Sequence, residues 1–169
     1  MFRRVGVVMK HKRWYVNKVP VQIGIATDHR GFIFKEAFRV QAMIGEIPVI
    51  WHDFGCFSPE RTDYPPYAHA VADAITQHRI DRGVLLCGSG AGMAITANRH
   101  PKIYAAVAWN KDSARNARAD DNSNVLVIPV DYVTQEQAQQ ILYIWLTTPF
   151  KEGRYAQRLH AIDNMNADI

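Results

Sequence analysis

The chain has 169 residues, of which 48% are hydrophobic and 21% charged, and this is enough apolar material for one globular domain with a buried core. Its formal charge of +4 arises in the first 27 residues, where six Lys and Arg occur without any Asp or Glu. The remainder is slightly acidic, so the charge does not predict a nucleic-acid-binding face. Two cysteines are too few for a disulfide framework.

Residues 1–20 are predicted to be a basic, poorly ordered extension, followed by one domain over residues 21–166. The apolar run Val5–Met9 is too short for a signal-peptide core or a membrane span. No long apolar run occurs elsewhere, so no membrane contact is expected. A cysteine at a working position suits a reducing compartment, and we therefore expect a cytoplasmic protein.

Apolar runs alternate with helical patterns along the rest of the chain. The predicted strands cover residues 21–26, 48–53, 84–87, 103–108 and 125–128. The predicted helices cover residues 33–43, 67–78, 93–98, 113–119, 134–146 and 153–165, with Thr134 as an N-cap. Strands that alternate with helices indicate parallel βαβ units. We therefore expect a Rossmann-like three-layer αβα sandwich with a mostly parallel five-stranded sheet.

Residues 84–98 carry the strongest chemical signal in the sequence. A buried strand ends at Cys87, and a turn of small residues then leads into a helix. The residues of this turn are Gly88, Ser89, Gly90, Ala91 and Gly92. In such a turn main-chain N–H groups approach a ligand closely, which suits an anion or an oxygen that becomes anionic during a reaction. Cys87 could act there as an acid or base if its pKa is lowered, although many small-residue turns serve only tight packing.

The turn reads G-S-G-A-G instead of the dinucleotide fingerprint G-x-G-x-x-G, and no P-loop lysine follows, so no nucleotide cofactor is expected. Polar residues also follow other predicted strands, with Asp28 and His29 directly after the first. The carboxyl ends of parallel strands meet at one edge of a sheet, where functional groups collect. Asp28, His29 and Cys87 are therefore expected to converge on one site.

Four separated motifs resemble the type B ribose-5-phosphate isomerases and the related galactose-6-phosphate isomerases. They are IATDHRGF, SPERTDYPPYA, LLCGSGAGMAITAN and EGRYAQR, and the similarity extends over residues 21–165. The resemblance implies an isomerase that interconverts ribose 5-phosphate and ribulose 5-phosphate through an enediolate, without a metal or organic cofactor. It also implies a homodimer, or a tetramer, in which the site is shared between subunits and the partner molecule is a phosphorylated sugar.

The resemblance assigns catalytic roles to individual residues. Cys87 falls where the cysteine-type members have the base that moves a proton between C1 and C2 of the open-chain sugar. Met93 stands where other members have a glutamate for this role. Ser89 matches the hydroxyl residue beside the base. Asp120 stands at the position of the residue that opens the sugar ring, which is a histidine in the family.

The resemblance also assigns substrate contacts. The implied substrate-binding residues are Asp28, His29, Tyr64, Gly88, Gly90, Ala91, Gly92 and Asp121. The phosphate is assigned to His29 together with Arg154 and Arg158, which lie four residues apart on one helical face. In the family these two arginines reach the active site of the neighbouring subunit. Arginine suits this role because its planar guanidinium matches phosphate oxygens.

Three residues depart from the pattern of the family. Asp120 and Asp121 replace a histidine and an asparagine, and Asp131 replaces a further phosphate-binding arginine. The last exchange changes the local charge by about two units, so Asp131 alone would repel a phosphate group.

Three interpretations of these departures are open. In the first, Asp120 replaces the ring-opening histidine, with a pKa raised by Asp121 and by partial burial, and the substrate is ribose 5-phosphate. In the second, the enzyme isomerises another sugar phosphate, such as a tetrose 4-phosphate that needs no ring opening, or a hexose 6-phosphate. In the third, the chain binds a sugar phosphate without turnover.

Overall fold

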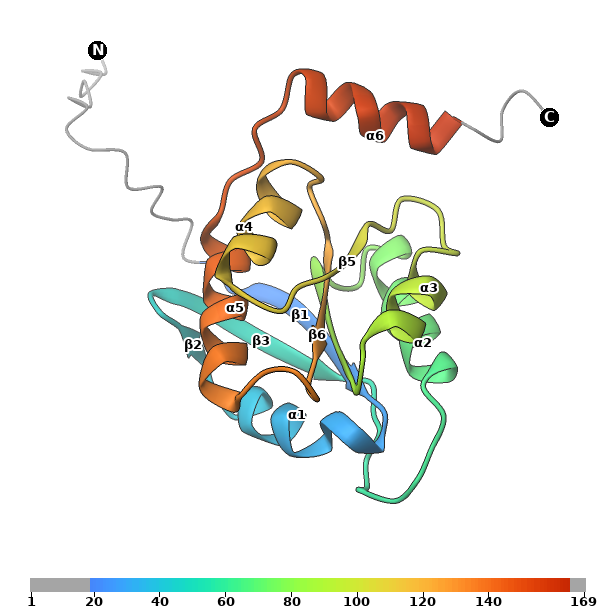
Figure 1. Cartoon of the computed structure of the whole chain (residues 1–169), viewed down its shortest axis with the longest axis vertical. Helices are drawn as coiled ribbons and strands as arrows, with labels where there is room; N and C mark the ends of the chain where they lie inside the picture. The colour runs from blue at the N-terminus through green and yellow to red at the C-terminus, as the bar shows by residue number, and fades with distance from the viewer. Residues whose placement is uncertain (1–18, 165–169) are drawn as a thin grey trace, which may run out of the picture.

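The computed structural model of the chain describes residues 19–164. Most of the predicted N-terminal extension and the last residues of the predicted domain, 165 and 166, lie outside this range. The described residues form an α/β sandwich, in which helices cover both faces of a central sheet with the strand order β2-β3-β1-β4-β6-β5 (Figure 1). The predicted fold class is confirmed.

The sheet has six strands, and the prediction of five is wrong by one. The strands are β1 (Val21–Thr27), β2 (Met43–Ile44), β3 (Ile47–Asp53), β4 (Arg82–Cys87), β5 (Ala105–Val107) and β6 (Val125–Pro129). All neighbouring strands pair in parallel except β2, which is antiparallel to β3 at the sheet edge.

Met43, the first residue of the missed strand β2, was predicted to be the last residue of a helix over residues 33–43. Helix α1 stops at Arg39, and Gly45 then adopts a φ of +61°, a conformation that glycine adopts without steric cost. This turn folds Met43 and Ile44 back onto Ile47 and Pro48 of β3. A strand of two residues is too short to show the alternation by which strands are recognised in a sequence.

The described part also contains six α-helices and one 3₁₀ turn, which, apart from the last helix, form the outer layers (Figure 1). They are η1 (His29–Gly31), α1 (Phe32–Arg39), α2 (Pro65–Thr76), α3 (Ala91–Ala97), α4 (Lys111–Ala119), α5 (Gln135–Thr147) and α6 (Arg154–Asn164). The predicted N-cap of α5 is confirmed, because the Thr134 side chain accepts a hydrogen bond from the main-chain N–H of Gln137. Within residues 19–164 no helix is long and apolar enough to cross a membrane.

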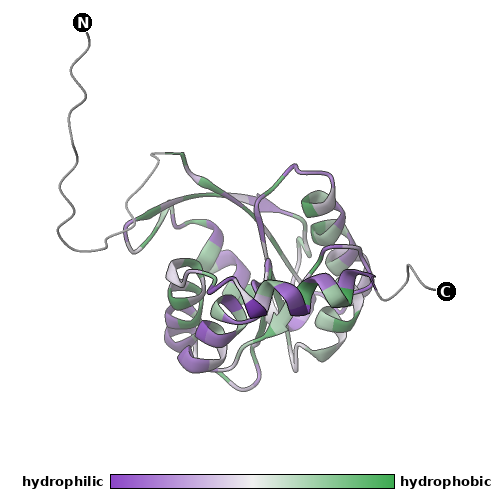
Figure 2. Cartoon of the chain, turned by 90° about the horizontal axis from the view of Figure 1, so that it is seen from above, coloured by the Kyte–Doolittle hydropathy of each residue, from purple (hydrophilic) through white to green (hydrophobic). Residues whose placement is uncertain are grey.

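The core lies on both sides of the central strand β4, whose residues from Gly83 to Cys87 are all buried. Val84 and Leu86 pack with residues of α1, α4 and α5, whereas Leu85 and Cys87 pack with residues of α2 and α3. Hydrophobic and hydrophilic segments alternate along the helices, as expected when each helix has one buried face (Figure 2). Cys87 is therefore the last residue of a strand that is covered on both faces.

Helix α6 lies apart from the two layers (Figure 1). Leu159 is its one buried residue. Near its end, Asp163 accepts hydrogen bonds from the Tyr104 hydroxyl at 2.7 Å and from the Lys102 ammonium. Just before its start, the main-chain N–H of Lys151 donates to the carbonyl of Ala119 at the end of α4. The helix is therefore held mainly by polar contacts near its two ends.

Candidate active site

Cys87 and Asp28 lie side by side at the carboxyl ends of two paired strands. The neighbours Thr27 and Leu86 are in register, so the residues that follow them project from the same edge of the sheet. The Cys87 thiol donates a hydrogen bond to Oδ2 of Asp28 at 3.0 Å, and both residues are buried. The other carboxylate oxygen, Oδ1, accepts the main-chain N–H of Arg30 at 3.0 Å and so fixes the orientation of Asp28. The expected convergence of Asp28 and Cys87 is present.

The surroundings of Cys87 keep its thiol protonated in the isolated protomer. Burial raises the pKa of Cys87, and the hydrogen bond to the Asp28 carboxylate and its negative charge raise it further, to about 11. Hydrogen bonds from the main chain at Gly90 and Gly88 act in the opposite direction but are outweighed. The sequence interpretation required a lowered pKa, and in the isolated protomer this condition is not met.

The glycine turn lies directly beyond the thiol and is closely packed on two sides. Gly90 has a φ of +77°, which favours glycine at this position. A Cβ atom on Gly88 would lie 2.6 Å from Nε of Arg30, and a Cβ atom on Gly92 would overlap the ring of Tyr64. A larger residue at either position would therefore require the neighbouring side chains to move. Between these two glycines Ser89 and Ala91 are exposed, which leaves the outer side of the turn open to a ligand.

The loop that precedes α2 lies beside His29 at the edge of the site. Nδ1 of His29 lies 3.1 Å from the carbonyl oxygen of Thr62, and Tyr64 follows two residues later against Gly92. Two of the predicted substrate-binding residues, His29 and Tyr64, are therefore brought close to the turn by this loop.

An ion pair between Arg30 and Asp131 lies on the other side of the turn, and nothing in the sequence spacing indicated it. Nε of Arg30 donates to Oδ1 of Asp131 at 3.2 Å, and Nη2 donates to Oδ2 at 2.6 Å. Asp131 follows β6, whose end pairs with the end of β4. A site residue that sequence reasoning missed, Arg30, thus neutralises the carboxylate that departs from the family pattern.

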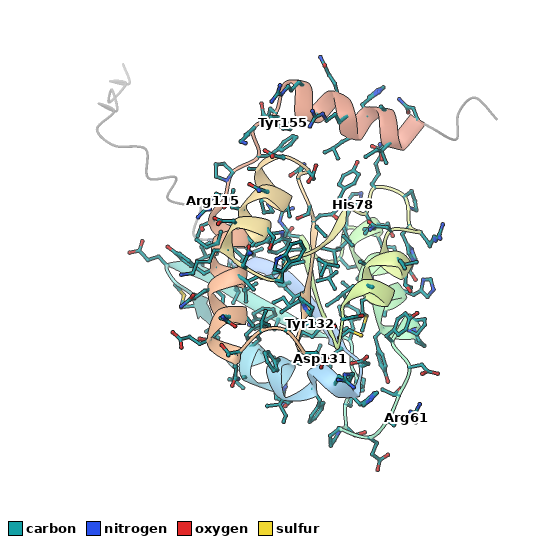
Figure 3. All side chains as sticks on the ribbon, viewed as in Figure 1. Arg61, His78, Arg115, Asp131, Tyr132 and Tyr155 are labelled. Carbon is teal, nitrogen blue, oxygen red and sulfur yellow. The ribbon has the colours of Figure 1, made fainter. Side chains whose placement is uncertain are left out.

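The remaining predicted site residues lie at the opposite edge of the sheet. Helix α4 runs from the carboxyl end of β5 to the amino end of β6, so Asp120 and Asp121, which follow α4, belong to the amino-end edge. Figure 3 shows the two edges, with Asp131 near one end of the molecule and Tyr155 of α6 near the other. Within one protomer Arg154 and Arg158 therefore do not reach Cys87.

Charged groups of the loop after α4 and of α6 form a cluster at this amino-end edge. Oδ1 of Asp120 accepts a hydrogen bond from the Lys151 ammonium at 2.6 Å. Burial, and then repulsion by Asp120, raises the pKa of Asp121, while the positive charge of Arg158 lowers it. The first interpretation of the sequence expected a raised pKa at Asp120, and the structure assigns a raised pKa to Asp121.

Basic side chains surround the ring of Tyr155 in the same cluster. Their charged groups lie 5.1 Å (Lys151), 5.0 Å (Arg154) and 5.3 Å (Arg158) from the ring centroid. The aromatic ring holds the three cations together on one exposed surface. This arrangement presents several donors to an anion that approaches from outside the protomer.

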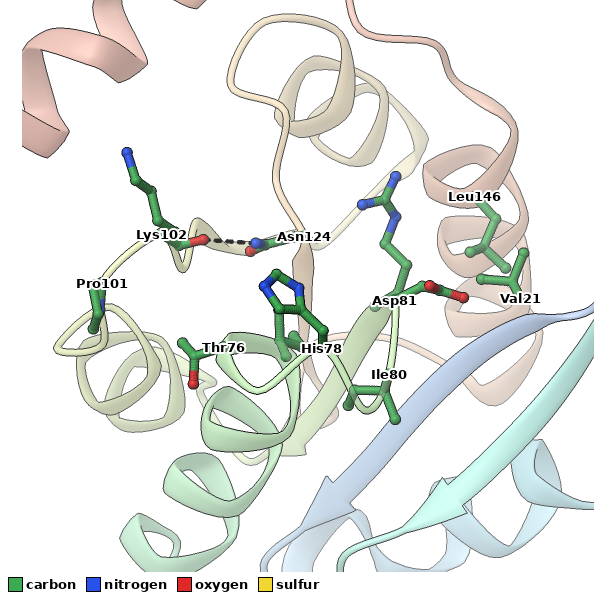
Figure 4. Close-up of a pocket in the computed structure, with 11 residues that line it drawn as sticks. Val21, Thr76, His78, Ile80, Asp81, Pro101, Lys102, Asn124 and Leu146 are labelled. Carbon is green, nitrogen blue, oxygen red and sulfur yellow. Dashed lines mark hydrogen bonds between the residues drawn. The ribbon is translucent and has the colours of Figure 1, made fainter.

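A pocket of about 720 Å³ also lies at the amino-end edge, remote from the thiol (Figure 4). His78, Asp81 and Lys102 contribute polar groups to its wall, and the Asn124 side chain donates to the carbonyl of Lys102 at 2.8 Å. Its lining includes neither Cys87 nor Asp28 nor the glycine turn. We therefore place the candidate active site at the carboxyl-end edge, where a thiol, a carboxylate and main-chain donors converge.

The pH dependence of Cys87 reactivity tests its environment without any assay of activity. In a Cys56→Ala protein, where Cys87 is the remaining thiol, the alkylation rate with iodoacetamide should rise about tenfold per pH unit and level off near pH 11, because only the thiolate reacts. Asp28→Asn should shift the midpoint to lower pH, since it removes the charge that disfavours the thiolate but retains an oxygen for the Arg30 N–H. If the alkylation rate had its midpoint near pH 9 in both proteins, burial and Asp28 would not raise the pKa of Cys87.

The fold and the site together define an α/β protein with a buried thiol and a buried carboxylate beside a glycine-rich turn. A family model described as Ribose/Galactose Isomerase matches residues 23–162. The chain therefore belongs to the Ribose/Galactose Isomerase family, and the resemblance seen in the sequence is confirmed. Among its relatives is ribose-5-phosphate isomerase B of Escherichia coli K12, which is 38% identical over 141 residues, covering 83% of this chain and 93% of the relative.

Solved structures agree with this assignment. A ribose 5-phosphate isomerase from Thermotoga maritima superposes with a TM-score of 0.81 at 40% identity, covering 86% of this chain and 99% of that chain. Ribose-5-phosphate isomerase B from Mycoplasma genitalium, solved with bound ribulose-5-phosphate, has a TM-score of 0.80 at 30% identity and covers 88% and 98% of the two chains. These relatives place the chain among the sugar phosphate isomerases similar to ribose-5-phosphate isomerase B.

Proposed function

We propose that the protein interconverts ribose 5-phosphate and ribulose 5-phosphate, with Cys87 as the base. The observation that carries this proposal is the position of the Cys87 thiol, which lies between the Asp28 carboxylate and the glycine turn. An aldose–ketose isomerase needs a base and, within reach of it, donors for an oxygen that becomes negative. The relative from Mycoplasma genitalium binds the ketose product of this reaction.

The proposed proton transfer proceeds through an enediolate. The Cys87 thiolate takes the proton from C2 of the open-chain aldose, and the electron pair of that bond forms a double bond between C2 and C1 while the oxygen on C1 becomes negative. Main-chain N–H groups of the turn Gly88–Gly92 stabilise this oxygen, and the exposed hydroxyl of Ser89 passes a proton between the two sugar oxygens. Return of the thiol proton to C1 regenerates the thiolate and yields the ketose.

Substrate binding is proposed to bring the thiol into its basic form. A sugar hydroxyl that donates to Oδ2 of Asp28 takes the place of the thiol hydrogen at that oxygen. This removes one of the causes that raise the pKa of Cys87, and the main-chain donors at Gly88 and Gly90 then favour the thiolate. The displaced proton leaves to water. In this scheme Asp28 binds the substrate, and in the free enzyme it acts with burial to keep the Cys87 thiol protonated.

We further propose that each active site is completed by a second copy of the chain in a homodimer. Arg154 and Arg158 lie at the opposite edge from Cys87 in the same protomer, on a surface where three cations face outward around Tyr155. A second copy can present this surface to the phosphate of a sugar held at Cys87, next to His29. Asp120 and Asp121 lie in the same cluster and would enter the shared site with the arginines.

One observation favours a second candidate substrate, a tetrose 4-phosphate. An acid role for Asp120 in ring opening requires that its hydrogen bond with the Lys151 ammonium, 2.6 Å long, is broken first. A tetrose 4-phosphate cannot close a five-membered ring through a hydroxyl that carries its phosphate, so it needs no ring-opening acid. The pair of Asp120 and Lys151 is compatible with such a substrate without rearrangement.

A panel of aldose phosphates tests the proposal and separates the two substrates. Each aldose phosphate is incubated with the enzyme and its ketose product is measured, and ribose 5-phosphate should give the highest kcat/KM. If Asp120 opens the ring, Asp120→Asn should lower turnover of ribose 5-phosphate by about 100-fold or more and leave erythrose 4-phosphate nearly unchanged, because only the pentose must be opened. Equal effects on both substrates would exclude ring opening by Asp120. Binding of sugar phosphates without ketose formation would contradict the proposed activity.

A further inference from the structure

We infer that Arg30, held in place by Asp131, binds the phosphate group of the substrate. The inference rests on the proposed function and concerns the same site. It assigns a role to a side chain that comes from the turn after β1, and it gives Asp131 a function as a positioning residue. Neither role follows from the position of the two residues in the sequence.

The geometry of the pair places a guanidinium at the mouth of the site. Arg30 lies in η1, directly after His29 and two residues after Asp28, which fixes its main-chain N–H. Its side chain crosses the glycine turn to Asp131, so that Gly88 lies against both partners, with a Cβ atom there only 2.6 Å from Arg30 and 2.8 Å from Asp131. The main-chain N–H of Asp131 in turn donates to the carbonyl of Gly88 at 3.2 Å. The ion pair and the turn therefore form one unit.

The pair leaves part of the guanidinium available for an anion. Arginine has five N–H donors, and Arg30 uses Nε and one hydrogen of Nη2 on Asp131. The other donors belong to a side chain that is 52% exposed. Two parallel hydrogen bonds to one carboxylate also fix the plane of the guanidinium, so its free edge has a defined direction. A fixed guanidinium with an open edge fits a phosphate group.

Charge explains why the two residues occur together. A lone carboxylate at Asp131 would repel a phosphate dianion. In the sequence, Asp131 replaces a phosphate-binding arginine of the family, and no residue that balances its charge could be identified there. The guanidinium of Arg30 neutralises Asp131 and presents its remaining N–H donors at the edge where the resemblance places an arginine. Exposed ion pairs add little to stability, so stabilisation alone does not account for a pair placed over the turn.

The kinetics of Arg30→Gln test the inference. The KM for the aldose phosphate should rise about 10- to 100-fold, the effect of losing a hydrogen bond between charged groups, while kcat changes little. Inhibition by inorganic phosphate should weaken by a similar factor, and kcat/KM for the unphosphorylated aldose should stay the same. Arg30→Lys should recover part of the loss, because the ammonium keeps the charge without the fork geometry.

Two further variants complete the test. Arg115→Gln removes another exposed arginine paired with an aspartate, Asp112, and should leave every constant unchanged. Adding Asp131→Asn to Arg30→Gln should lower the KM again, because the double variant no longer presents an unpaired carboxylate to the phosphate. A KM for the aldose phosphate that is unchanged in Arg30→Gln, or one that rises equally for the unphosphorylated sugar, would overturn the inference.

The two proposals can fail separately. If the wild-type enzyme forms a ketose and Arg30→Gln has the same KM, the isomerase proposal stands and the role of Arg30 falls. If the wild-type enzyme forms no ketose from any aldose phosphate, the isomerase proposal falls. Calorimetric titration with inorganic phosphate then still decides whether Arg30 binds a phosphate group, since equal affinity of the wild type and Arg30→Gln would exclude it.

Discussion

Replacing Cys87 with alanine should stop the exchange of the C2 proton of the aldose phosphate with solvent and lower kcat by about 100- to 10,000-fold, the range typical of a general base. The reason is that the thiol is the group placed between Asp28 and the donors of the glycine turn. The measurement is proton NMR in deuterated water, which follows loss of the C2 signal and entry of deuterium at C1 of the ketose. Circular dichroism and thermal unfolding should show an intact fold, because the side chain removed is small.

The second thiol provides the matched control. Cys56 is also buried, with 2% exposure, and burial likewise raises its pKa, but it lies in the loop after β3 and has no part in the proposed proton transfer. Cys56→Ala should therefore keep kcat within a few-fold of the wild type. Exchange at the wild-type rate in Cys87→Ala would remove Cys87 from the mechanism, whatever the effect of Cys56→Ala.

Heterodimers that combine two inactive chains should regain activity if the site is shared. We expect homodimers of Cys87→Ala, and homodimers of Arg154→Ala/Arg158→Ala, to be nearly inactive at low substrate concentration. A heterodimer of these two chains has one site that joins an intact Cys87 to intact arginines of the other chain. Co-expression with random pairing should therefore give about a quarter of the wild-type activity, since about half of the dimers are mixed and each has one working site.

A second heterodimer gives the opposite result and serves as the control. It pairs a wild-type chain with a chain that carries all three substitutions, so each shared site lacks either the thiol or the arginines. Purified by two different affinity tags, this heterodimer should be inactive, whereas the first one should retain about half of the wild-type activity. If each site were built within one chain, the two heterodimers would show the reverse pattern.

Much of the fold followed from local patterns. The buried runs in β1, β4 and β6 and the cap at Thr134 are signals within a few neighbouring residues, and the structure has these elements close to their expected bounds. The short strand β2 was not predictable in this way, because its place depends on a turn at Gly45 and on pairing with β3.

The juxtaposition of Asp28 and Cys87 was predictable from the sequence, but the electrostatics of the candidate site were not. Asp28 and Cys87 could be brought together from the sequence because both follow strands of a parallel sheet. The raised pKa of Cys87 could not be predicted, because it depends on the burial of the thiol and on its contact with the Asp28 carboxylate. Arg30 and Asp131 are 101 residues apart, and their pairing was not predicted, although the unexplained negative charge at Asp131 was a reason to look for a positive partner.

The raised pKa of Cys87 also affects how readily the thiol is oxidised or alkylated. With a pKa of about 11, only a very small fraction of Cys87 is in the reactive thiolate form at neutral pH in the isolated protomer. Peroxides and electrophilic metabolites attack thiolates, so a protonated Cys87 is less open to sulfenic acid formation and to covalent inactivation. Chemical injury to Cys87 would then occur mainly during turnover, when the thiolate forms.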